Sequence, residues 1–369
     1  MSDRVFMQRA LDLAERGRGL TSPNPLVGAV LVREGRVVGE GAHLRAGGPH
    51  AEIAALQAAG DGARGATLYV TLEPCAHQGR TPPCAPAVAR ASVGRVVIAL
   101  ADPNPLVVGG GADQLRAAGI TVELGVLAAE AERQNRAWLT AMRQRRPHVT
   151  LKAAATLDGK LADVHGTSKW ITGEAARQRA HRLRAESDAV VVGVTTVLRD
   201  DPALTVRLAD PWPREPYRIV LDTTARLGVD ARVIHAGTPS RTIVAVGTQA
   251  PPERVTALTS VGAQVLRCPT REGRVDPVAL LERLFELEVR AVLVEGGGET
   301  HAAFVEAGVV DRVALFLAPL LLGGRDATGI VGGAGRDLKA ALRLASLTAT
   351  SVGDDLLIEA DVLRDLGSG

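Results

Sequence analysis

The stretch His50-Ala51-Glu52, followed by TLEPCAHQGRTPPC at residues 71–84, decides the fold of the first half of the chain. It offers one imidazole, two thiols, Cys75 and Cys84, and a carboxylate, Glu52, that need not bind a metal. An imidazole and two thiolates form a zinc site that keeps its fourth position for water. We interpret the stretch as the zinc centre of a hydrolytic deaminase, in which Glu52 moves protons between water and the substrate ring.

The residues around these side chains predict where each one lies. Apolar residues at helical spacing predict a helix over 51–59, which places His50 and Glu52 at its first turn. A proline precedes both Cys75 and Cys84, so we expect each cysteine to begin a helix. The positive end of a helix lowers the pKa of a thiol and favours thiolate, the form that binds zinc.

Two structural alternatives stay open for this centre: a closed zinc knot without chemistry, or a buried histidine with two core thiols. The two motifs occur in order with a predicted strand, 66–72, between them and no evident fourth protein ligand, which favours catalysis. One feature departs from the nucleobase deaminase signature, because eight residues rather than two separate Cys75 from Cys84. We expect this insertion to loop out beside the metal and to contact substrate.

Composition limits the class of protein. A chain of 369 residues, 46% of them hydrophobic, is long enough for two globular domains. Charged residues make up 23% with a net charge of +2, and aromatics only 2%, which argues against nucleic-acid binding. No apolar run approaches the roughly 18 residues of a membrane helix. Three cysteines do not form a disulfide framework, so we expect a cytoplasmic protein.

Alternating strands and helices predict two α/β domains, 1–146 and 147–369. In the first domain we expect strands over 26–32, 37–42, 66–72, 95–100 and 120–124, and helices over 5–13, 51–59, 111–118 and 127–143. In the second we expect strands over 148–155, 189–194, 218–222, 242–246, 291–295 and 313–317, and helices over 173–184, 277–288 and 300–306. The basic segment 143–146 is predicted to be a solvated helix end.

Two glycine-rich segments have different meanings. Residues 60–65 satisfy G-x-G-x-x-G, but they follow a helix and precede a strand, the reverse of the order in a dinucleotide fingerprint. We interpret them as a turn. Residues 296–300 lead from a predicted strand into a helix, as phosphate-binding turns do, although many α/β turns are glycine-rich without binding phosphate.

The motifs resemble a known family. Residues 71–84, with PNPLVG at 23–28 and DPNP at 102–105, resemble the deaminase half of the bifunctional riboflavin biosynthesis proteins. The second half resembles the reductase half of that family, over the four segments 151–160, 168–172, 195–202 and 294–297. The resemblance implies an N-terminal cytidine-deaminase-like α/β domain and a C-terminal α/β domain similar to dihydrofolate reductase.

The resemblance also implies site residues. From spacing alone, Asn24 is a turn residue and His43 a solvated loop residue, whereas in the family both positions belong to the deaminase pocket. The implied NADPH-binding residues are Ala154, Trp170, Thr196, Asp200, Thr223, Gly297, Gly298, Glu299, Thr300, His301, Ala302 and Ala303. The implied substrate-binding residues are Ser168, Arg184, Leu204, Arg207 and Glu295.

The residue types suit these roles. Two arginines, Arg184 and Arg207, can clamp a phosphate, and Glu295 can accept from sugar hydroxyls. Lys152 and Asp200 can each supply the proton that accompanies hydride. From the residues alone, surface ion pairs for the arginines, a core position for Trp170 and a turn cap for Asp200 stay open.

The implied function is a two-step reaction of riboflavin synthesis. Zinc-dependent deamination of 2,5-diamino-6-(5-phosphoribosylamino)pyrimidin-4(3H)-one would be followed by NADPH-dependent reduction to 5-amino-6-(5-phosphoribitylamino)uracil. The expected partner is this small phosphoribosyl pyrimidine, with no nucleic acid or membrane, in a homo-oligomer. Two alternatives remain: deamination of a nucleic-acid base, as in tRNA adenosine deaminases, and a zinc-stabilised regulator without turnover.

Overall fold

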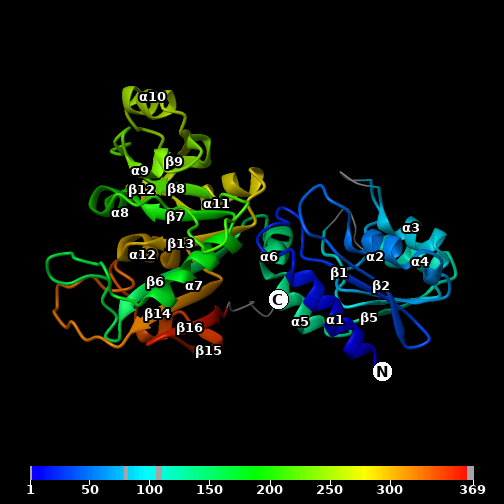
Figure 1. Ribbon diagram of the computed structural model, residues 1–369. Coiled ribbons are helices and arrows are strands. Elements are labelled where there is room, and N and C mark those ends of the chain that lie inside the picture. The colour runs from blue at the N-terminus through cyan, green and yellow to red at the C-terminus, as the bar shows by residue number, and fades with distance from the viewer. Residues whose placement is uncertain (1, 79–81, 105–109, 364–369) are drawn as a thin grey trace. The chain divides into compact units, whose positions relative to one another are not determined.

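The computed structural model describes residues 2–78, 82–104 and 110–363, and the chain divides into two compact units, Met1–Arg145 and Arg146–Gly369 (Figure 1). The division falls one residue before the predicted one, because Arg146 joins the second unit. Within the described residues, no helix combines the length and the apolar character that crossing a membrane requires.

The first unit is a five-stranded sheet covered on both faces, with strand order β2-β1-β3-β4-β5. Strand β1 is antiparallel to β2 and β3, whereas β3, β4 and β5 are parallel. The strands are β1 (Gly28–Arg33), β2 (Arg36–Ala42), β3 (Thr67–Val70), β4 (Arg95–Ile98) and β5 (Thr121–Leu124). The helices are α1 (Asp3–Glu15), α2 (Ala51–Ala59), the 3₁₀ turn η1 (Gly60–Ala63), α3 (Cys84–Arg90), α4 (Gly110–Ala117), α5 (Ala128–Gln134) and α6 (Arg136–Gln144).

Alternation along β1 explains why both faces are covered. Leu31 packs with residues of α2, α3 and α4, whereas Val30 packs with residues of α1 and α6 on the other face. Successive strand residues point to opposite faces, so a strand that is buried on both sides is a nearly continuous apolar run. The helices α2, α3 and α4 therefore group on one side of the sheet in Figure 1.

The second unit is a nine-stranded sheet of order β10-β9-β8-β7-β13-β6-β14-β16-β15, in which only the pairs β14–β16 and β16–β15 are antiparallel. The strands are β6 (His148–Thr156), β7 (Ala189–Gly193), β8 (Tyr217–Leu221), β9 (Thr242–Gly247), β10 (Gln264–Cys268), β13 (Ala291–Gly296), β14 (Arg312–Ala318), β15 (Leu344–Val352) and β16 (Asp355–Val362), beside the hairpin β11 (Thr270–Arg271) and β12 (Arg274–Val275).

The second unit buries its parallel strands between helices. The helices are α7 (Glu174–Glu186), α8 (Val194–Asp200), α9 (Arg232–His235), α10 (Pro252–Ser260), α11 (Pro277–Glu286) and α12 (Gly298–Glu306), with 3₁₀ turns η2 (Pro239–Arg241) and η3 (Leu338–Ala340). Leu280 and Leu284 of α11 pack in one cluster with Val191, while Leu258 of α10 packs in another with Val192. Val191 and Val192, which are neighbours on β7, therefore belong to two separate hydrophobic cores.

Two predictions near the boundary are wrong. The helix expected over 127–143 is broken at Asn135. The basic segment 143–146, which was expected to be solvated, includes one buried residue, Arg146. The guanidinium of Arg146 is buried and donates to both carboxylate oxygens of Asp311, each at 2.7 Å, within the second unit. The same carboxylate accepts from the backbone N–H of Val149, so it ties the start of β6 to this pair.

Asn135 breaks the helix because its side chain binds backbone elsewhere. Its Nδ2 donates to the carbonyl of Leu26 and its Oδ1 accepts from the N–H of Leu26, both at 2.8 Å. These two hydrogen bonds have the pattern of a backbone pair in a β-sheet, with the side chain of Asn135 in place of a strand residue. Leu26, the backbone partner, leads into β1. Asparagine side chains readily bond to backbone groups outside a helix, which makes asparagine unfavourable in a helix interior, and here Asn135 lies between α5 and α6.

Replacing Asn135 by leucine should destabilise the first unit by about 1–3 kcal/mol, because it leaves the buried backbone groups of Leu26 without their partner. Asn135→Asp keeps the acceptor but loses the donor, so its effect should be intermediate. Urea denaturation measures both. Equal stability of the leucine variant and the native chain would show that the two hydrogen bonds contribute nothing net.

Candidate active sites

The three predicted metal ligands meet in the first unit. His50 is the N-cap of α2, Cys84 is the first residue of α3, and Cys75 lies after β3 in a segment without regular secondary structure. His50 Nδ1 is 3.6 Å from the Cys75 sulfur and 3.3 Å from the Cys84 sulfur, and all three donor atoms lie within 4.8 Å of one another. Zinc bonds of about 2.0–2.3 Å in a tetrahedron put donors roughly 3.5 Å apart, so the set fits zinc.

The prediction that Cys75 begins a helix is wrong, whereas that for Cys84 is confirmed. The N-terminus of α3 nevertheless contains Cys84 and contacts Cys75. The N–H of Cys84 points at the Cys75 sulfur at 3.4 Å, and the N–H of Ala85 donates to the Cys75 carbonyl at 3.1 Å. Gly111 of α4 packs so closely that an added Cβ would lie 1.8 Å from the Pro74 carbonyl, beside Cys75. Glycine is needed there.

Three groups that can become anions, Cys75, Cys84 and Glu52, are crowded at this site. The thiol of Cys84 and the imidazole of His50 lower the pKa of Cys75 to about 4. The neighbouring Cys75 sulfur and burial raise the pKa of Cys84, and burial raises the pKa of Glu52. Two sulfurs and a buried carboxylate cannot all carry charge at this spacing without a cation. A divalent metal supplies that balance and favours both thiolates.

Asn24 and His43 lie together beside the metal ligands. His43 is buried, which excludes the solvated-loop alternative, and its ring centre is 5.4 Å from that of His50. Its Nδ1 is 2.9 Å from the carbonyl of Pro49, so Nδ1 carries the proton and Nε2 accepts from Asn24 Nδ2 at 3.1 Å. Burial and the nearby His50 lower the pKa of His43 and keep it neutral.

The insertion between the cysteines is only partly described, since residues 79–81 lie outside the described ranges. Gln78 and Pro82, on either side of that gap, are exposed. Pro105, the end of the DPNP motif, also lies outside them. Asp102, within the same motif, is a further ionisable group of this region that no sequence pattern marked. It is buried, and burial, with the charges of Glu73 and Cys75, raises its pKa to about 7.

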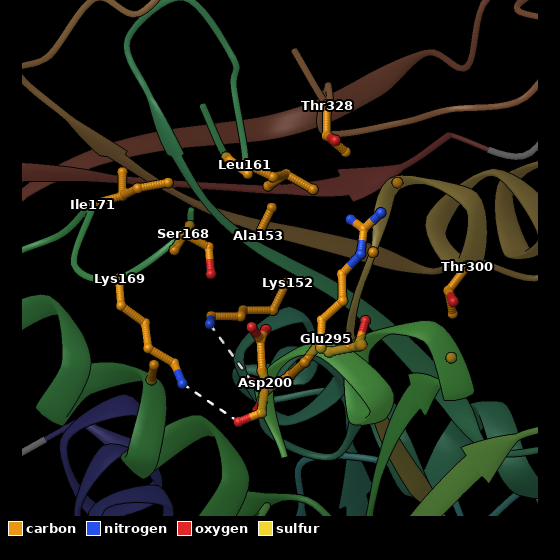
Figure 2. A pocket seen from close by; sticks show the side chains of 18 of the residues that line it. Lys152, Ala153, Leu161, Ser168, Lys169, Ile171, Asp200, Glu295, Thr300 and Thr328 are labelled. Atoms are coloured by element: carbon orange, nitrogen blue, oxygen red, sulfur yellow. Dashed lines mark hydrogen bonds and ion pairs between the residues drawn. The ribbon is translucent and has the colours of Figure 1, made fainter. Parts of the chain in front are cut away.

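A cavity of about 660 Å³ lies in the second unit (Figure 2). Strand register explains why its charged residues meet: Leu151 of β6 pairs with Val294 of β13, so the next residues, Lys152 and Glu295, are neighbours. Ligands bind at the carboxyl ends of parallel strands in such sheets. The predicted residues that line the cavity are Lys152, Ala154, Ser168, Trp170, Arg184, Thr196, Asp200, Arg207, Glu295, Gly297, Gly298, Glu299 and Thr300.

Five predicted residues are not among those that line it. Leu204, His301 and Ala302 are buried, and His301 Nδ1 lies 2.7 Å from the carbonyl of Ile330. Ala303 lies further along α12. Thr223 follows β8, where its Oγ1 accepts from the N–H of Val275 at 3.2 Å. Their contacts with ligand stay predictions.

The glycine-rich turn has the geometry of a phosphate cradle. Gly297 has φ of +72°, which favours glycine, and α12 begins at Gly298, two residues earlier than predicted. A Cβ on Gly298 would lie 2.8 Å from the Gly329 carbonyl. Bare N–H groups at the start of a helix favour an anion, so this turn fits the phosphates of a dinucleotide.

Lys152, Arg184 and Glu295 form a largely buried cluster in the cavity wall, with side chains 13%, 15% and 7% exposed. Arg184 donates through Nε and Nη2 to the two carboxylate oxygens of Glu295, and Lys152 Nζ is 3.6 Å from Glu295 Oε2, as Figure 2 shows for the lysine. Burial raises the pKa of Glu295, but Arg184 and Lys152 outweigh it and hold this pKa at about 2. Burial lowers the pKa of Lys152, although Glu295 opposes the shift.

This pairing changes the expected roles of the arginines. Arg184 Nη1 also donates to the carbonyl of Thr205 at 3.1 Å, so its guanidinium is directed at the protein rather than at a ligand. Trp170 is 68% exposed, which excludes a core position, and the guanidinium of Arg177 lies 4.6 Å from its ring centre. Arg177 and His181 also line the cavity, and no sequence motif marked them.

Comparison with known proteins assigns the family. Residues 147–358 match the model of the RibD C-terminal domain, and residues 1–100 match that of the cytidine and deoxycytidylate deaminase zinc-binding region. The chain belongs to the RibD family. The riboflavin biosynthesis protein RibD of Aquifex aeolicus is 44% identical over 356 residues, 96% of this chain and 97% of the relative. RibD of Escherichia coli is 43% identical over 344 residues, 89% of this chain and 91% of the relative.

Solved structures agree with the RibD assignment. Form 1 of Acinetobacter baumannii RibD has a TM-score of 0.89 at 39% identity and covers 98% of this chain and 99% of its own. A Thermotoga maritima protein described as a diaminohydroxyphosphoribosylaminopyrimidine deaminase/5-amino-6-(5-phosphoribosylamino)uracil reductase has a TM-score of 0.84 at 36% identity and covers 98% of each chain. The predicted fold class, a cytidine-deaminase-like domain followed by a dihydrofolate-reductase-like domain, is confirmed.

The purified RibD-family chain should contain one zinc ion, and Cys84→Ala should lose most of it, because two ligands do not hold zinc tightly. Cys268→Ala is the matched control, since Cys268 is a buried cysteine of the second unit. Metal content by mass spectrometry checks the prediction. Full zinc occupancy in the Cys84 variant would contradict the assigned ligand set.

Proposed function

We propose that this chain is a bifunctional enzyme of riboflavin synthesis. Its first unit deaminates 2,5-diamino-6-(5-phosphoribosylamino)pyrimidin-4(3H)-one, and its second unit reduces the ribosyl group of the product with NADPH to give 5-amino-6-(5-phosphoribitylamino)uracil. One observation carries the proposal: His50, Cys75 and Cys84 meet beside a buried Glu52 in a chain that matches RibD proteins over nearly its full length. The description of the Thermotoga maritima relative supports both steps.

In the first unit, His50, Cys75 and Cys84 would hold zinc, which would supply activated water at neutral pH. Glu52 would take a proton from water as it adds to the amidine carbon and would pass it to the ring nitrogen. It would then take the proton of the newly added hydroxyl and deliver it to the amine, which leaves as ammonia while the C=O bond forms. Its burial raises its pKa, which suits a group that must hold a proton between these steps. Neutral His43 fixes the amide of Asn24, which keeps a donor and an acceptor for the pyrimidine.

In the second unit, Gly297 and Gly298 would hold the phosphates of NADPH, which would supply the hydride. The group to be reduced is the sugar carbon attached to nitrogen, ring-opened as an imine or aldehyde equivalent. The reduction also needs a proton. Lys152 and Asp200 both line the cavity, and we favour Lys152 because burial lowers its pKa and eases proton release. Glu295 holds Lys152 in place at 3.6 Å.

The test supplies the diaminopyrimidine substrate to the intact enzyme and follows two signals. Ammonia should be released with or without NADPH, because deamination comes first. The absorbance of NADPH should fall only when substrate is present, in proportion to the deaminated product. If only one signal is seen, the other unit is assigned wrongly.

We also propose that the enzyme is a cytoplasmic homo-oligomer. Strand β15 is an edge of the nine-stranded sheet, and most of its residues are exposed, including Leu344 and Leu347. A long uncovered edge strand with exposed leucines is an unfavourable surface for an isolated chain, so a second copy is a suitable cover. Sedimentation of the purified chain measures the number of copies. Free thiols at the metal site suit a reducing compartment.

A further inference from the structure

Helix α7 holds a neighbouring chain segment through one histidine. His181 is 9% exposed and lines the cavity of the second unit. Its Nδ1 lies 3.3 Å from the backbone nitrogen of Arg207, and its Nε2 lies 3.3 Å from the Nε of the same arginine. A neutral imidazole has one acceptor nitrogen, so it takes one of these two N–H groups at a time. Either hydrogen bond holds Arg207 against the helix.

The guanidinium of Arg207 contacts His181 only through its Nε–H. The Arg207 side chain is exposed and lines the cavity, and within the described ranges its two Nη groups have no hydrogen-bond or ion-pair partner. Arg184 differs, because Glu295 and the Thr205 carbonyl engage its guanidinium. Two parallel N–H groups on a fixed guanidinium match two oxygens of a phosphate. The geometry therefore points to Arg207, rather than Arg184, as the arginine that binds phosphate.

The charges around His181 keep it an acceptor. It faces Arg184 on its own helix, Arg207 on the segment after α8, Glu295 on β13 and Lys152 on β6. Burial and the two arginines lower the pKa of His181 to about 4, and Glu295 only partly opposes them. The ring is therefore neutral at neutral pH. A protonated ring would set a cation against Arg207 instead of holding it.

We propose that His181 is a positioning residue of the reductase, which orients the guanidinium of Arg207 for the terminal phosphate of the phosphoribosyl substrate. The inference rests on the proposed function and adds the residue that fixes the phosphate-binding arginine. Phosphate groups also occur in NADPH, so the two sources must be separated by measurement. His181 acts through Arg207 and need not contact the reacting carbon.

The experiment uses the intact enzyme and steady-state reduction of the deaminated phosphoribosyl substrate. His181→Leu removes the acceptor while keeping an apolar side chain of comparable size, and His181→Gln keeps an acceptor. Gln178→Ala is the matched control, because Gln178 is an exposed residue of the same helix whose amide bonds Glu174. Losing a hydrogen bond to a charged group should raise the KM of the substrate roughly tenfold to a hundredfold.

The pattern of effects separates positioning from a structural role. For His181→Leu we expect kcat within about twofold of the native value and an unchanged KM for NADPH, with most of the substrate KM restored in His181→Gln. In an Arg207→Ala background, His181→Leu should add almost nothing, because its partner is absent. The same substrate without its phosphate should be reduced equally well by both forms.

Other outcomes overturn the inference. An unchanged substrate KM in His181→Leu, a rise in the KM of NADPH instead, or full additivity with Arg207→Ala would each do so. If His181→Leu does not fold, Arg207→Lys decides, because lysine keeps the charge but lacks the Nε–H; an unchanged substrate KM there overturns the proposal. If the native enzyme fails to reduce the substrate, the proposed function fails, and that result is distinguishable from these.

Discussion

Replacing Glu52 by glutamine should lower the turnover of deamination by roughly 10² or more, the usual contribution of a general acid/base. Glutamine keeps the size and the hydrogen-bonding shape of the side chain but cannot carry a proton between water, ring nitrogen and leaving amine. The loss should fall on kcat, because these transfers occur after substrate has bound. Ammonia release under saturating substrate measures the effect.

Two properties of the Glu52 variant should not change. Zinc content should stay at one ion per chain, because Glu52 is not among the ligands, and reduction of separately supplied deaminated substrate should proceed normally in the second unit. Gln57→Ala, an exposed change on the same helix, is the control and should leave deamination intact. Native turnover in Glu52→Gln would remove Glu52 from the mechanism.

Replacing Glu295 by glutamine should destabilise the second unit by about 3–5 kcal/mol and abolish reduction, because it leaves two largely buried cations, Arg184 and Lys152, without their counter-charge. Both cations lie within 4 Å of the carboxylate. Their repulsion would then be relieved only by deprotonation of Lys152 or by opening of the cavity wall. Hydrogen exchange of the β6 and β13 amides measures the loss of stability in this unit.

Lys152→Met, compared with Glu295→Gln, separates the effect on stability from the effect on reduction. It removes one cation but keeps the bidentate pair of Arg184 with Glu295, so the exchange of the same amides should stay close to native. Reduction should nevertheless fall, if Lys152 supplies the proton as proposed. Native stability in Glu295→Gln would mean that water reaches the cluster and screens it, contrary to its burial.

Local chemistry explains which parts of the fold could be predicted. Helix α2 begins where the apolar spacing and the preceding His50 place it, because a helix start is encoded by a few consecutive residues. The break at Asn135 could not be found in this way. Its cause is Leu26, 109 positions earlier in the chain, and no pattern around Asn135 reveals that partner.

The same reasoning applies to the sites. The candidate zinc ligands could be predicted from the order and spacing of one histidine and two cysteines, whereas the reductase residues needed the family resemblance. The ion pair between Arg184 and Glu295 joins positions 111 apart, so the arginine was expected to bind phosphate instead. His181 is one histidine among the many polar residues of α7, and only the fold brings it to Arg207.

The salt bridge between Arg146 and Asp311 sets a limit on how the enzyme can be dissected. Arg146 is the first residue of the second unit, yet its guanidinium neutralises a carboxylate 165 positions later that also receives the N–H of Val149. A gene fragment that starts at residue 147 would delete this cation and leave a carboxylate buried beside the first strand. Separate expression of the reductase half should therefore begin upstream of Arg146, and a natural split of such a fused gene would have to keep that codon with the second half.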